Sequence, residues 1–399
     1  MKQKIITFVL TLVFNIFKLL PIKRGVYIFE SQYGGRFDDN PKAIYDYLKK
    51  QDSAEHKLFW SIRYRDRNIV GEEDGSVLYR FSLRWLYYMA RAEFWIINAR
   101  MPQWLPKRKE TTYVQTWHGT PLKKLALDMD TFGMPGSSLE NYKKKFLAET
   151  QKWDYLVAPN QYSKEIFKSC FAFEKTFIES GYPRNDVLYQ KNNPEDIKAI
   201  KERLGLPLDK KVILYAPTWR DDYYISKGKY KFHVPFDMNQ LIDVLGDDAV
   251  FIFRAHYLVA ESLDELSTHP NVFNFSTNVD ISDLYLVSDL LVTDYSSVFF
   301  DYANLKRPML FYAYDYEHYR DNLRGFYFDL EQDAPGPFVT EEKTFLKKIS
   351  TYIIEEIFIE TLEKQEKFYE KFCEWEDGRA AEKILHHISH DVKFQKNKE

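Results

Sequence analysis

The sequence has only two cysteines, Cys170 and Cys373, and neither belongs to a CxxC pair or to a cysteine–histidine cluster with metal-ligand spacing. This scarcity argues against a disulfide framework and a structural zinc site, and it favours a reducing, cytoplasmic environment. Four short catalytic signatures are also absent: GxSxG, HExxH, the Walker A loop and the Rossmann GxGxxG fingerprint. Their absence argues against a serine hydrolase, a zinc protease, a P-loop ATPase and a simple dehydrogenase.

An excess of positive charge is lacking as well. The 56 lysines and arginines nearly balance the 59 acidic residues, which leaves a formal net charge of −3. Proteins that bind nucleic acid non-specifically present an overall positive field to its phosphates. A nucleic-acid partner is therefore not expected.

The apolar run near the N-terminus, residues 5–20, is shorter than the roughly 20 residues that a membrane-spanning helix needs. Basic residues flank it at positions 2, 4, 23 and 24, and polar residues recur inside it at positions 7, 11, 15 and 18. No small-x-small cleavage site follows, which argues against a signal peptide. The pattern predicts an interfacial helix on an anionic membrane surface, with a true anchor or a helix buried in the fold as alternatives.

Short apolar, β-rich runs alternate with helical stretches along the chain, which is typical of βαβ units in mostly parallel sheets. The 399 residues suit two or three domains. A first series of strands is predicted at residues 25–29, 57–62, 94–98, 112–116, 155–158 and 176–179, with helices at 40–50 and 83–92. A second series is predicted at residues 211–216, 250–253, 272–275, 290–293 and 309–312. The polar segment 191–210 separates the two series, and helices follow from residue 340, the last of them after a capping Asp377.

The segment TWHGTPLKK, residues 116–124, directly follows a predicted strand. In an open α/β sheet, ligands bind beyond the carboxyl ends of the strands, so His118 is expected in a cleft. A histidine there can act as a general base near neutral pH. Gly119 allows the backbone to approach a ligand, and Lys123 and Lys124 can neutralise phosphate. The competing interpretation is a histidine that only hydrogen-bonds its turn.

Two further strand ends carry polar groups. In FRAHY, residues 253–257, Arg254 and His256 alternate along an extended chain and so point to the same side, which suits a pyrophosphate. An ion-paired arginine and a core histidine are the alternative. In TDYSSVFFD, residues 293–301, Ser296 or Ser297 is predicted to cap a helix whose free N–H groups bind an anion. Asp301 lies on the same helix face as Ser297 and can bind a ribose or polyol hydroxyl.

Three weaker segments complete the pattern. YAPTWR, residues 215–220, offers a hydroxyl, an aromatic ring and a guanidinium, and GYPRND, residues 181–186, offers another glycine and arginine. Either is also explained by turn chemistry and surface charge. Asp128 and Asp130 form a DxD triplet of the kind that holds a metal in some nucleotide-sugar enzymes. Such triplets arise by chance among 59 acidic residues, and no metal site is predicted.

Together these segments resemble the CDP-glycerol glycerophosphotransferase family of teichoic acid synthesis. The matching stretches are SQYGG at 31–35, DNPK at 39–42, WHGT at 117–120, GYPR at 181–184, APTWR at 216–220, RAH at 254–256, TDYSS at 293–297 and DG at 377–378. They follow the family's order and cover nearly the whole chain after the N-terminal helix.

The resemblance implies an α/β fold of the GT-B type, in which two Rossmann-like domains face each other across a cleft that holds the CDP-linked donor. It implies a membrane-interfacial helix at residues 1–22, an acceptor domain at 23–195, a CDP-donor domain at 196–375, and a C-terminal helix and tail at 376–399.

The resemblance also implies roles for individual residues. His118 matches the base that deprotonates the acceptor hydroxyl, and His256 matches a histidine that stabilises the donor's phosphates. The expected donor- and phosphate-binding residues are Pro217, Thr218, Arg220, Arg254, Thr293, Asp294, Ser296, Ser297 and Asp301. The expected acceptor-side residues are Gly119, Thr120, Lys123, Lys124, Gly181, Arg184 and Asn185.

The implied reaction moves a polyol phosphate from CDP-glycerol or CDP-ribitol to a prenyl-diphosphate-linked saccharide acceptor and releases CMP, without a metal or other cofactor. The enzyme is then expected to be peripheral on the cytoplasmic face of the cell membrane. Polymerising members carry a long extra N-terminal region that is missing here, which favours a primase or a compact polymerase.

Two other classes of protein fit the same motifs. A GT-B glycosyltransferase that uses a nucleotide sugar shares the fold and the phosphate site, and the released nucleotide, CMP against UDP or GDP, separates it from a polyol-phosphate transferase. A membrane-bound scaffold for wall-polymer assembly would keep the fold but show no turnover.

Overall fold

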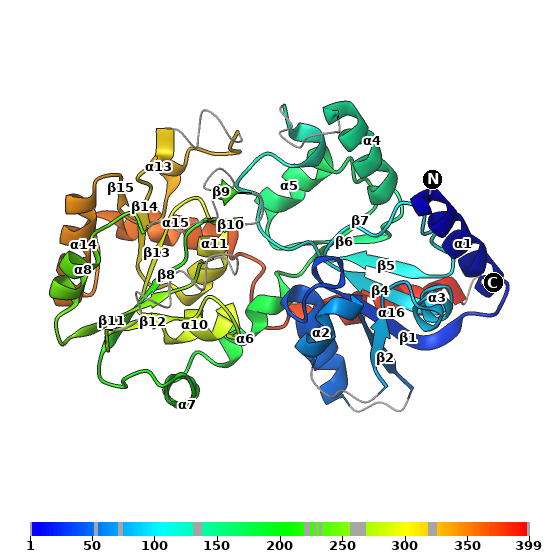
Figure 1. Ribbon diagram of the computed structural model, residues 1–399, viewed down its shortest axis with the longest axis horizontal. Coiled ribbons are helices and arrows are strands. Elements are labelled where there is room, and N and C mark those ends of the chain that lie inside the picture. Colours follow the sequence, from blue (N-terminus) through cyan, green and yellow to red (C-terminus); the bar gives the residue numbers. More distant parts are fainter. Residues whose placement is uncertain are drawn as a thin grey trace. The chain divides into compact units, whose positions relative to one another are not determined.

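The computed structural model describes residues 2–51, 55–70, 75–130, 138–218, 224–226, 229–230, 234–255, 269–317 and 325–396. They form two compact units, each built on its own parallel β-sheet (Figure 1). Unit 1 comprises Met1–His118, Leu125–Asp186 and Trp375–Glu399, and unit 2 comprises Gly119–Lys124 and Val187–Glu374. The chain therefore enters unit 2 directly after His118 and again after Asp186, and it returns to unit 1 at Leu125 and at Trp375.

The sheet of unit 1 has seven parallel strands in the order β3-β2-β1-β4-β5-β6-β7. The strands are β1 (Lys23–Glu30), β2 (Lys57–Ile62), β3 (Val77–Tyr79), β4 (Ala92–Ile97), β5 (Thr112–Gln115), β6 (Tyr155–Ala158) and β7 (Thr176–Glu179). The direction of winding reverses between β1 and β4, and such a topological switch point is where doubly wound sheets bind ligands.

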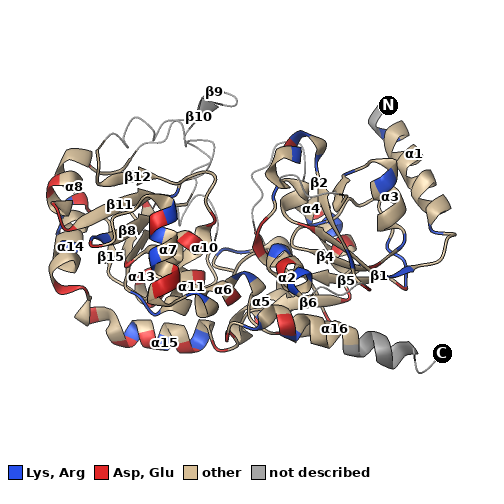
Figure 2. Cartoon of the chain, turned by 90° about the horizontal axis from the view of Figure 1, so that it is seen from below, with Lys and Arg blue, Asp and Glu red and all other residues tan. Residues whose placement is uncertain are grey.

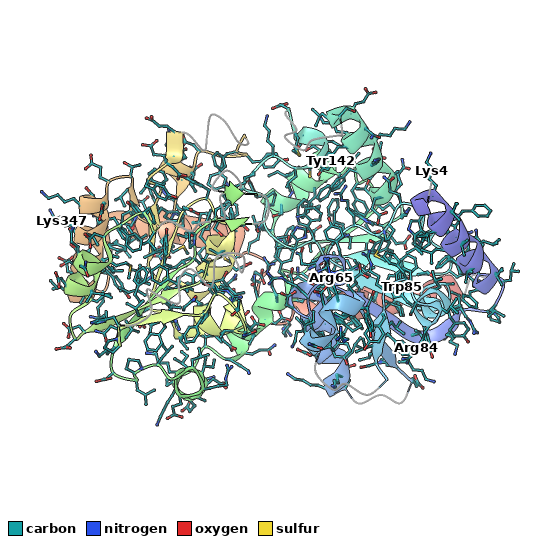
Figure 3. All side chains as sticks on the ribbon, viewed as in Figure 1. Lys4, Arg65, Arg84, Trp85, Tyr142 and Lys347 are labelled. Carbon is teal, nitrogen blue, oxygen red and sulfur yellow. The ribbon has the colours of Figure 1, made fainter. Side chains whose placement is uncertain are left out.

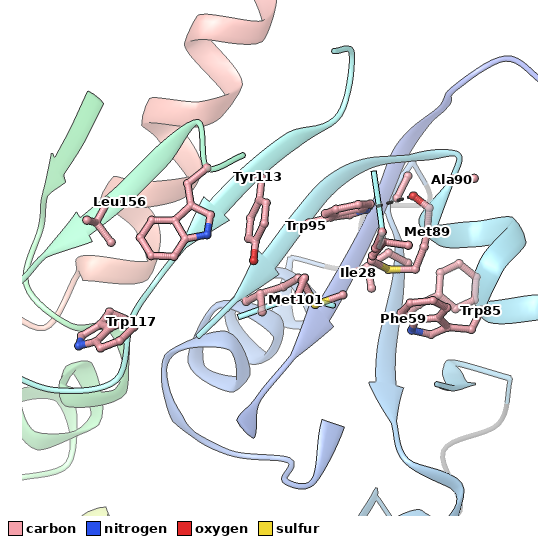
Figure 4. Close-up of a cluster of buried hydrophobic side chains, with 14 of the residues drawn as sticks. Ile28, Phe59, Trp85, Met89, Ala90, Trp95, Met101, Tyr113, Trp117 and Leu156 are labelled. Atoms are coloured by element: carbon pink, nitrogen blue, oxygen red, sulfur yellow. Dashed lines mark hydrogen bonds between the residues drawn. The ribbon is translucent and has the colours of Figure 1, made fainter. Parts of the chain in front are cut away.

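The helices of unit 1 cover both faces of this sheet. They are α1 (Lys2–Phe17), α2 (Asp39–Lys50), α3 (Leu83–Met89), α4 (Leu139–Thr150), α5 (Gln161–Cys170) and α16 (Ala380–Lys396), with short 3-10 turns η1 (Gln32–Gly34), η2 (Tyr64–Val70), η3 (Ala126–Asp128) and η4 (Pro183–Asn185). Large aromatic rings fill the core beneath them, as Figure 4 shows for Trp85 and Trp95. The buried indole of Trp95 donates to the carbonyl of Met89 at 3.2 Å, so its polar atom is satisfied.

Unit 2 repeats the arrangement with six parallel strands in the order β12-β11-β8-β13-β14-β15. The strands are β8 (Lys211–Tyr215), β11 (Ala249–Phe253), β12 (Val272–Asn274), β13 (Leu290–Thr293), β14 (Met309–Tyr312) and β15 (Phe338–Val339), and a separate antiparallel pair is formed by β9 (Tyr224–Ser226) and β10 (Lys229–Tyr230). The switch point of this sheet lies between β8 and β13.

The helices of unit 2 are mostly short. They are α7 (Pro194–Leu204), α8 (Met238–Leu245), α10 (Ile281–Val287), α11 (Val298–Tyr302), α13 (Leu330–Asp333), α14 (Glu342–Glu355) and α15 (Leu362–Phe372), with 3-10 turns η6 (Ala303–Leu305) and η7 (Ile359–Thr361). The helix α6 (Asp186–Gln190) begins where the chain enters this unit. Asn193 caps α7 by accepting a hydrogen bond from the backbone N–H of Asp196, and Gly205 ends it in the left-handed conformation.

The α/β fold with two parallel sheets is confirmed. Predicted and observed strands coincide at 57–62, 155–158, 176–179, 290–293 and 309–312. The strands β3 and β15 were not predicted, because three and two residues at a sheet edge are too few to leave a periodic pattern.

The N-terminal helix α1 has one buried and one exposed apolar side. Phe14 is fully buried in the core cluster of unit 1, and the ring of Phe17 meets Tyr87 of α3 edge-on at 5.4 Å. The opposite side exposes Phe8, Leu12 and other apolar residues, and Figure 2 shows α1 as an almost wholly uncharged helix. Of the polar stripe, Asn15 is exposed and Thr7, Thr11 and Lys18 are only partly exposed, so the outer side of α1 is mainly apolar. Within the described residues, no helix has the length and hydropathy of a membrane span.

The last helix, α16, returns to unit 1, where it packs on α2. The prediction that Asp377 caps it is wrong, because Asp377 accepts from the N–H of Arg379. The carboxylate of Asp186 instead accepts from the N–H groups of Ala380 and Ala381, at 2.8 and 2.9 Å. Burial raises the pKa of Asp186 to about 6, against the lowering effect of these two hydrogen bonds.

Candidate active site

A polar cluster lies at the switch point of unit 1, where β1 and β4 end. Its centre is Asn98, the first residue after β4. The side-chain oxygen of Asn98 accepts from the backbone N–H of Gln32 at 2.9 Å, and its amide nitrogen donates to Asp39 at 2.7 Å and to Ser31 at 3.0 Å. Asn98 therefore ties the loop after β1 to the loop after β4 and fixes the position of the Asp39 carboxylate.

The backbone carbonyl of Asn98 also holds the predicted base. Nδ1 of His118 lies 2.7 Å from this oxygen. A carbonyl can only accept a hydrogen bond, so Nδ1 carries the proton and Nε2 of the neutral ring keeps its lone pair. The imidazole is partly exposed and stacks on the ring of Trp117, with centroids 4.3 Å apart. The structure thus presents His118 as an oriented proton acceptor.

The backbone before His118 is strained. Trp117 has a φ of 53°, in the left-handed region that bulky residues rarely adopt. Its N–H donates to the side chain of Gln115 at 2.9 Å, and its carbonyl accepts from Asn40 at 3.1 Å. Strain of this kind persists where the surroundings over-determine a conformation, as they do at functional sites. Here it turns the chain at the end of β5 so that His118 reaches Asn98.

Arg184 joins the same cluster from a distant part of the sequence. Its guanidinium donates to Oδ1 of Asp39 and to the backbone carbonyl of His118, both at 2.9 Å. Its backbone N–H donates to the side chain of Asn40 at 3.2 Å. Arg184 therefore bridges the carboxylate beside His118 and the backbone that carries it.

The loop that carries Arg184 is held by Glu376. One carboxylate oxygen of Glu376 accepts from the N–H of Tyr182 at 3.0 Å and from the side chain of Asn185 at 2.9 Å. Gly181 has a φ of +83°, and a Cβ at this position would lie 2.5 Å from the other carboxylate oxygen, so the loop requires glycine. Of the predicted acceptor-side residues, Gly181 and Asn185 thus support the cluster while Arg184 belongs to it.

The surroundings of His118 keep its imidazole neutral. Desolvation by the protein atoms packed around the ring is the largest effect and lowers the pKa of His118 below its ordinary value of 6.5, and the positive charge of Arg184 lowers it as well. The carboxylate of Asp39 and the hydrogen bond to Asn98 act in the opposite direction. A neutral imidazole with a free Nε2 is the form that a general base needs at neutral pH.

The residues that directly follow His118 belong to unit 2. The backbone of this segment pairs with 325–327: the N–H of Lys124 donates to Gly325 at 2.8 Å, and the N–H of Tyr327 donates to Leu122 at 2.9 Å. Gly119 and Thr120 are buried, and Lys123 and Lys124 are partly exposed. These four predicted acceptor-side residues are therefore fixed by the fold of unit 2, although the sequence places them beside the base.

A second polar cluster lies at the switch point of unit 2, between the ends of β8 and β13. The hydroxyl of Thr293 donates to the carbonyl of Ala216 at 2.8 Å, and the buried carboxylate of Asp294 accepts from the N–H of Thr218 at 2.7 Å. Pro217 is partly exposed between them. Thr293 and Asp294 thus shape the loop after β8, which brings together four of the predicted donor-site residues.

Ser296 and Ser297 follow this cluster and are partly exposed. Ser297 stands before α11, but its side chain accepts no hydrogen bond from the helix, so the predicted side-chain cap is wrong. The reason is its helical backbone, with φ −67° and ψ 0°, whereas a capping serine needs an extended one. The helix has only five residues, so its dipole is small. An anion bound here would therefore be held by the serine hydroxyls and the backbone N–H groups and not by the dipole of α11.

The remaining donor-site predictions have mixed outcomes. The guanidinium of Arg254 donates to the carbonyl of Phe275 at 2.6 Å, so part of its hydrogen-bonding capacity serves the fold. Asp301 is buried in α11, and its carbonyl accepts from Asn304 at 2.9 Å. His256 and Arg220 lie outside the described residues. The expectation that Arg254 and His256 point to the same side stays a prediction.

The sequence interpretation missed four residues of the unit 1 cluster. Asp39 and Asn40 lay in a matching stretch but received no role, and Asn98 appeared only as the last residue of a predicted strand. A polar side chain that directly follows an apolar strand was the available signal for Asn98. No local signal marked Glu376, which acts on residues about 190 positions earlier.

No group of three or more histidine, cysteine or acidic side chains suited to a metal ion occurs in the described part of the chain. In the DxD triplet, the carboxylate of Asp128 accepts from the hydroxyl of Ser169 at 2.8 Å.

Two parallel sheets with Rossmann-type strand order, one of them presenting an oriented histidine at its switch point, define a GT-B-type transferase. The chain belongs to the CDP-Glycerol:Poly(glycerophosphate) glycerophosphotransferase family, whose model matches residues 12–390. The resemblance inferred from the motifs is therefore confirmed.

Named relatives agree with this assignment. The chain is 51% identical over 383 residues to a teichoic acid poly(glycerol phosphate) polymerase of Bacillus spizizenii, and this match covers 95% of each chain. It is 46% identical over 388 residues to a teichoic acid glycerol-phosphate transferase of Staphylococcus aureus, and this match covers 97% of this chain and 98% of the other. A solved structure of the wall teichoic acid polymerase TagF superposes with a TM-score of 0.88 at 42% identity, over 97% of this chain and 94% of the chain in that structure. A histidine-to-asparagine variant of TagF soaked with CDPG matches equally well, with a TM-score of 0.88.

Proposed function

We propose that the protein transfers glycerol phosphate from CDP-glycerol to a lipid-linked wall-polymer acceptor and releases CMP. The observation that carries this proposal is the neutral, oriented imidazole of His118 at the switch point of unit 1. Family membership supplies the reaction class, and the relatives from Bacillus spizizenii and Staphylococcus aureus are named as a poly(glycerol phosphate) polymerase and a glycerol-phosphate transferase.

In the proposed reaction, Nε2 of His118 removes the proton from a hydroxyl of the acceptor. The acceptor oxygen attacks the β-phosphorus of CDP-glycerol, and the bond from this phosphorus to the bridging oxygen breaks, so CMP leaves with that oxygen. The nearby carboxylate of Asp39 favours the imidazolium that forms. This division of labour gives the acceptor side to unit 1, which holds most of residues 23–195 and is supported by α16, and the donor side to unit 2, which holds residues 196–374.

The donor side needs groups that stabilise a pyrophosphate. We assign this role to the donor-site residues that follow β8 and β13, with the hydroxyls of Ser296 and Ser297 and the neighbouring backbone N–H groups as donors. Thr293 and Asp294 hold the loop that contains Pro217 and Thr218. Arg254, Asp301, Arg220 and His256 complete the proposed set.

The test is an assay of the purified protein with CDP-glycerol, CDP-ribitol and nucleotide sugars, each offered with prenyl-diphosphate-linked saccharide acceptors. We expect release of CMP from CDP-glycerol and a product heavier by one or more glycerol phosphate units in the mass spectrum. Release of UDP or GDP from a nucleotide sugar would identify a glycosyltransferase instead. A folded protein without turnover of any donor would support the scaffold interpretation.

The charges around His118 predict opposite pH effects for two variants. Because Asp39 raises and Arg184 lowers the pKa of His118, Asp39→Asn should move the acidic limb of the kcat/KM profile to lower pH, and Arg184→Gln should move it to higher pH. In the unmodified protein this limb should lie below pH 6.5, since activity is lost only as the imidazole gains a proton. Asp46→Asn on α2 serves as the control. If the acidic limb moved in the same direction in Asp39→Asn and in Arg184→Gln, His118 would not be the titrating base.

We further propose that α1 docks the protein on the cytoplasmic face of the membrane through its exposed apolar side. Phe8, Leu12 and Ile16 on that side are 69%, 52% and 54% exposed, and an apolar side chain that enters the interface contributes about 1.5 kcal/mol or more. The double variant Phe8→Ser/Leu12→Ser should therefore bind anionic lipid vesicles at least about tenfold more weakly in co-sedimentation, with an unchanged melting temperature.

Phe14→Ala on the buried side of α1 is the matched comparison. It should destabilise the protein by about 3 kcal/mol, the usual cost of truncating a buried phenylalanine, because Phe14 belongs to the core of unit 1. Vesicle binding that survives Phe8→Ser/Leu12→Ser would remove α1 as the docking element.

A further inference from the structure

Unit 1 contains a cavity of about 350 Å³ at the same carboxyl edge of its sheet. Arg80, which follows β3, and Arg100, which follows β4, line it together with Lys145 and Glu149 of α4. Arg100 lies two residues after Asn98, whose carbonyl holds His118. The cavity therefore adjoins the loop that positions the base, and its volume suits a small polar group.

Arg100 is held in place by aromatic rings and not by an anion. Its guanidinium lies 4.6 Å from the ring centroid of Phe146 and 5.3 Å from that of Tyr142, which Figure 3 labels on α4. Among the described residues, neither the guanidinium of Arg100 nor the ammonium of Lys145 makes a hydrogen bond or an ion pair. Stacking on rings orients a guanidinium while its N–H groups stay available, so the cavity holds two cations whose donors remain unused.

The acidic groups around the cavity are already neutralised. Glu149 lies 3.1 Å from the ammonium of Lys152, and its other oxygen accepts from the N–H of Met101 at 3.0 Å and from the hydroxyl of Tyr113 at 3.2 Å. The guanidinium of Arg80 pairs at 3.2 Å with the buried Glu30. The charges of Arg100 and Lys145 are therefore left uncompensated, and they favour a negatively charged ligand.

We propose that this cavity is an acceptor subsite in which Arg100 and Lys145 bind a phosphate group of the polyol-phosphate acceptor chain. The inference rests on the proposed function. A guanidinium binds two phosphate oxygens through parallel N–H groups, and a nearby ammonium adds a point charge. An acceptor phosphate bound here, beside the loop that carries Asn98, would help to direct the terminal hydroxyl toward Nε2 of His118.

The double variant Arg100→Gln/Lys145→Gln tests the proposal in steady-state kinetics. The KM for an acceptor that already carries glycerol phosphate should rise at least about tenfold, whereas kcat at saturating acceptor and the KM for CDP-glycerol should be unchanged. Lys144→Gln, an exposed neighbour of Lys145 on α4, is the control and should change neither KM. A raised KM for CDP-glycerol with an unchanged acceptor KM would instead assign the phosphate to the donor and overturn the proposal.

A binding experiment without donor separates the subsite from the reaction. In calorimetric titration, the unmodified protein should bind a short glycerol phosphate oligomer, and the double variant should bind it at least about tenfold more weakly. Equal binding by both proteins, or equal binding of uncharged glycerol, would overturn the subsite. Oligomer binding that depends on Arg100 and Lys145 in a protein without transferase activity would uphold the subsite while rejecting the proposed reaction.

Discussion

His118→Ala is expected to lower the rate of glycerol phosphate transfer by at least about a hundredfold, because general base catalysis contributes about that much or more. The variant removes the ring that the carbonyl of Asn98 orients, while the donor groups assigned to unit 2 stay intact. The affinity for CDP-glycerol should therefore not change. Single-turnover rates and equilibrium dialysis with labelled CDP-glycerol measure the two quantities separately.

His386→Ala is a suitable control for this variant, since His386 is exposed on α16. It should retain the activity of the unmodified protein. A parallel fall of donor affinity and rate in His118→Ala would show that His118 binds the donor and does not act as the base.

The double variant Ser296→Ala/Ser297→Ala should weaken CDP-glycerol binding by about 1–3 kcal/mol, or roughly 5- to 150-fold, which is the scale of hydrogen bonds lost to a charged group. In the described part of the chain neither hydroxyl takes part in a hydrogen bond, so the melting temperature should stay within about one degree. Isothermal titration with CDP-glycerol and a thermal melt measure the two effects.

Ser350→Ala, which removes a partly exposed hydroxyl on α14 of the same unit, is the matched control for the serine pair. It should leave donor affinity unchanged. Full affinity in the double variant would remove the segment after β13 from the donor site, although the family assignment would stand.

Most elements of the fold could be predicted because their signals are local. Apolar runs bounded by turn residues placed β2, β6, β7, β13 and β14 at their observed bounds. Local reasoning failed where the deciding contact is distant. The N-terminus of α16 is an example. Asp377 stands at the right place in the sequence, but the hydrogen bonds to the first N–H groups of the helix come from Asp186, which lies 194 residues before Ala380.

In the candidate site, too, some features could be predicted from local motifs and others depend on distant contacts. A histidine followed by glycine after a strand was enough to single out His118, and the order of the motifs was enough to identify the family. The neighbours that decide its chemistry, Asp39 and Arg184, could not be ranked from the sequence, because 145 residues separate them.

The sequence by itself determined the alternation of strands and helices and the family, and it singled out His118 as the candidate base. Periodicity, turn residues and motifs are properties of short segments, and they are legible without the fold. Only the tertiary structure decided the tautomer and lowered pKa of His118, the assignment of Gly119–Lys124 to unit 2 and the cavity lined by Arg100 and Lys145. These depend on which strand ends become neighbours at a switch point, and that is set by the order of the strands in the sheet, which no short segment encodes.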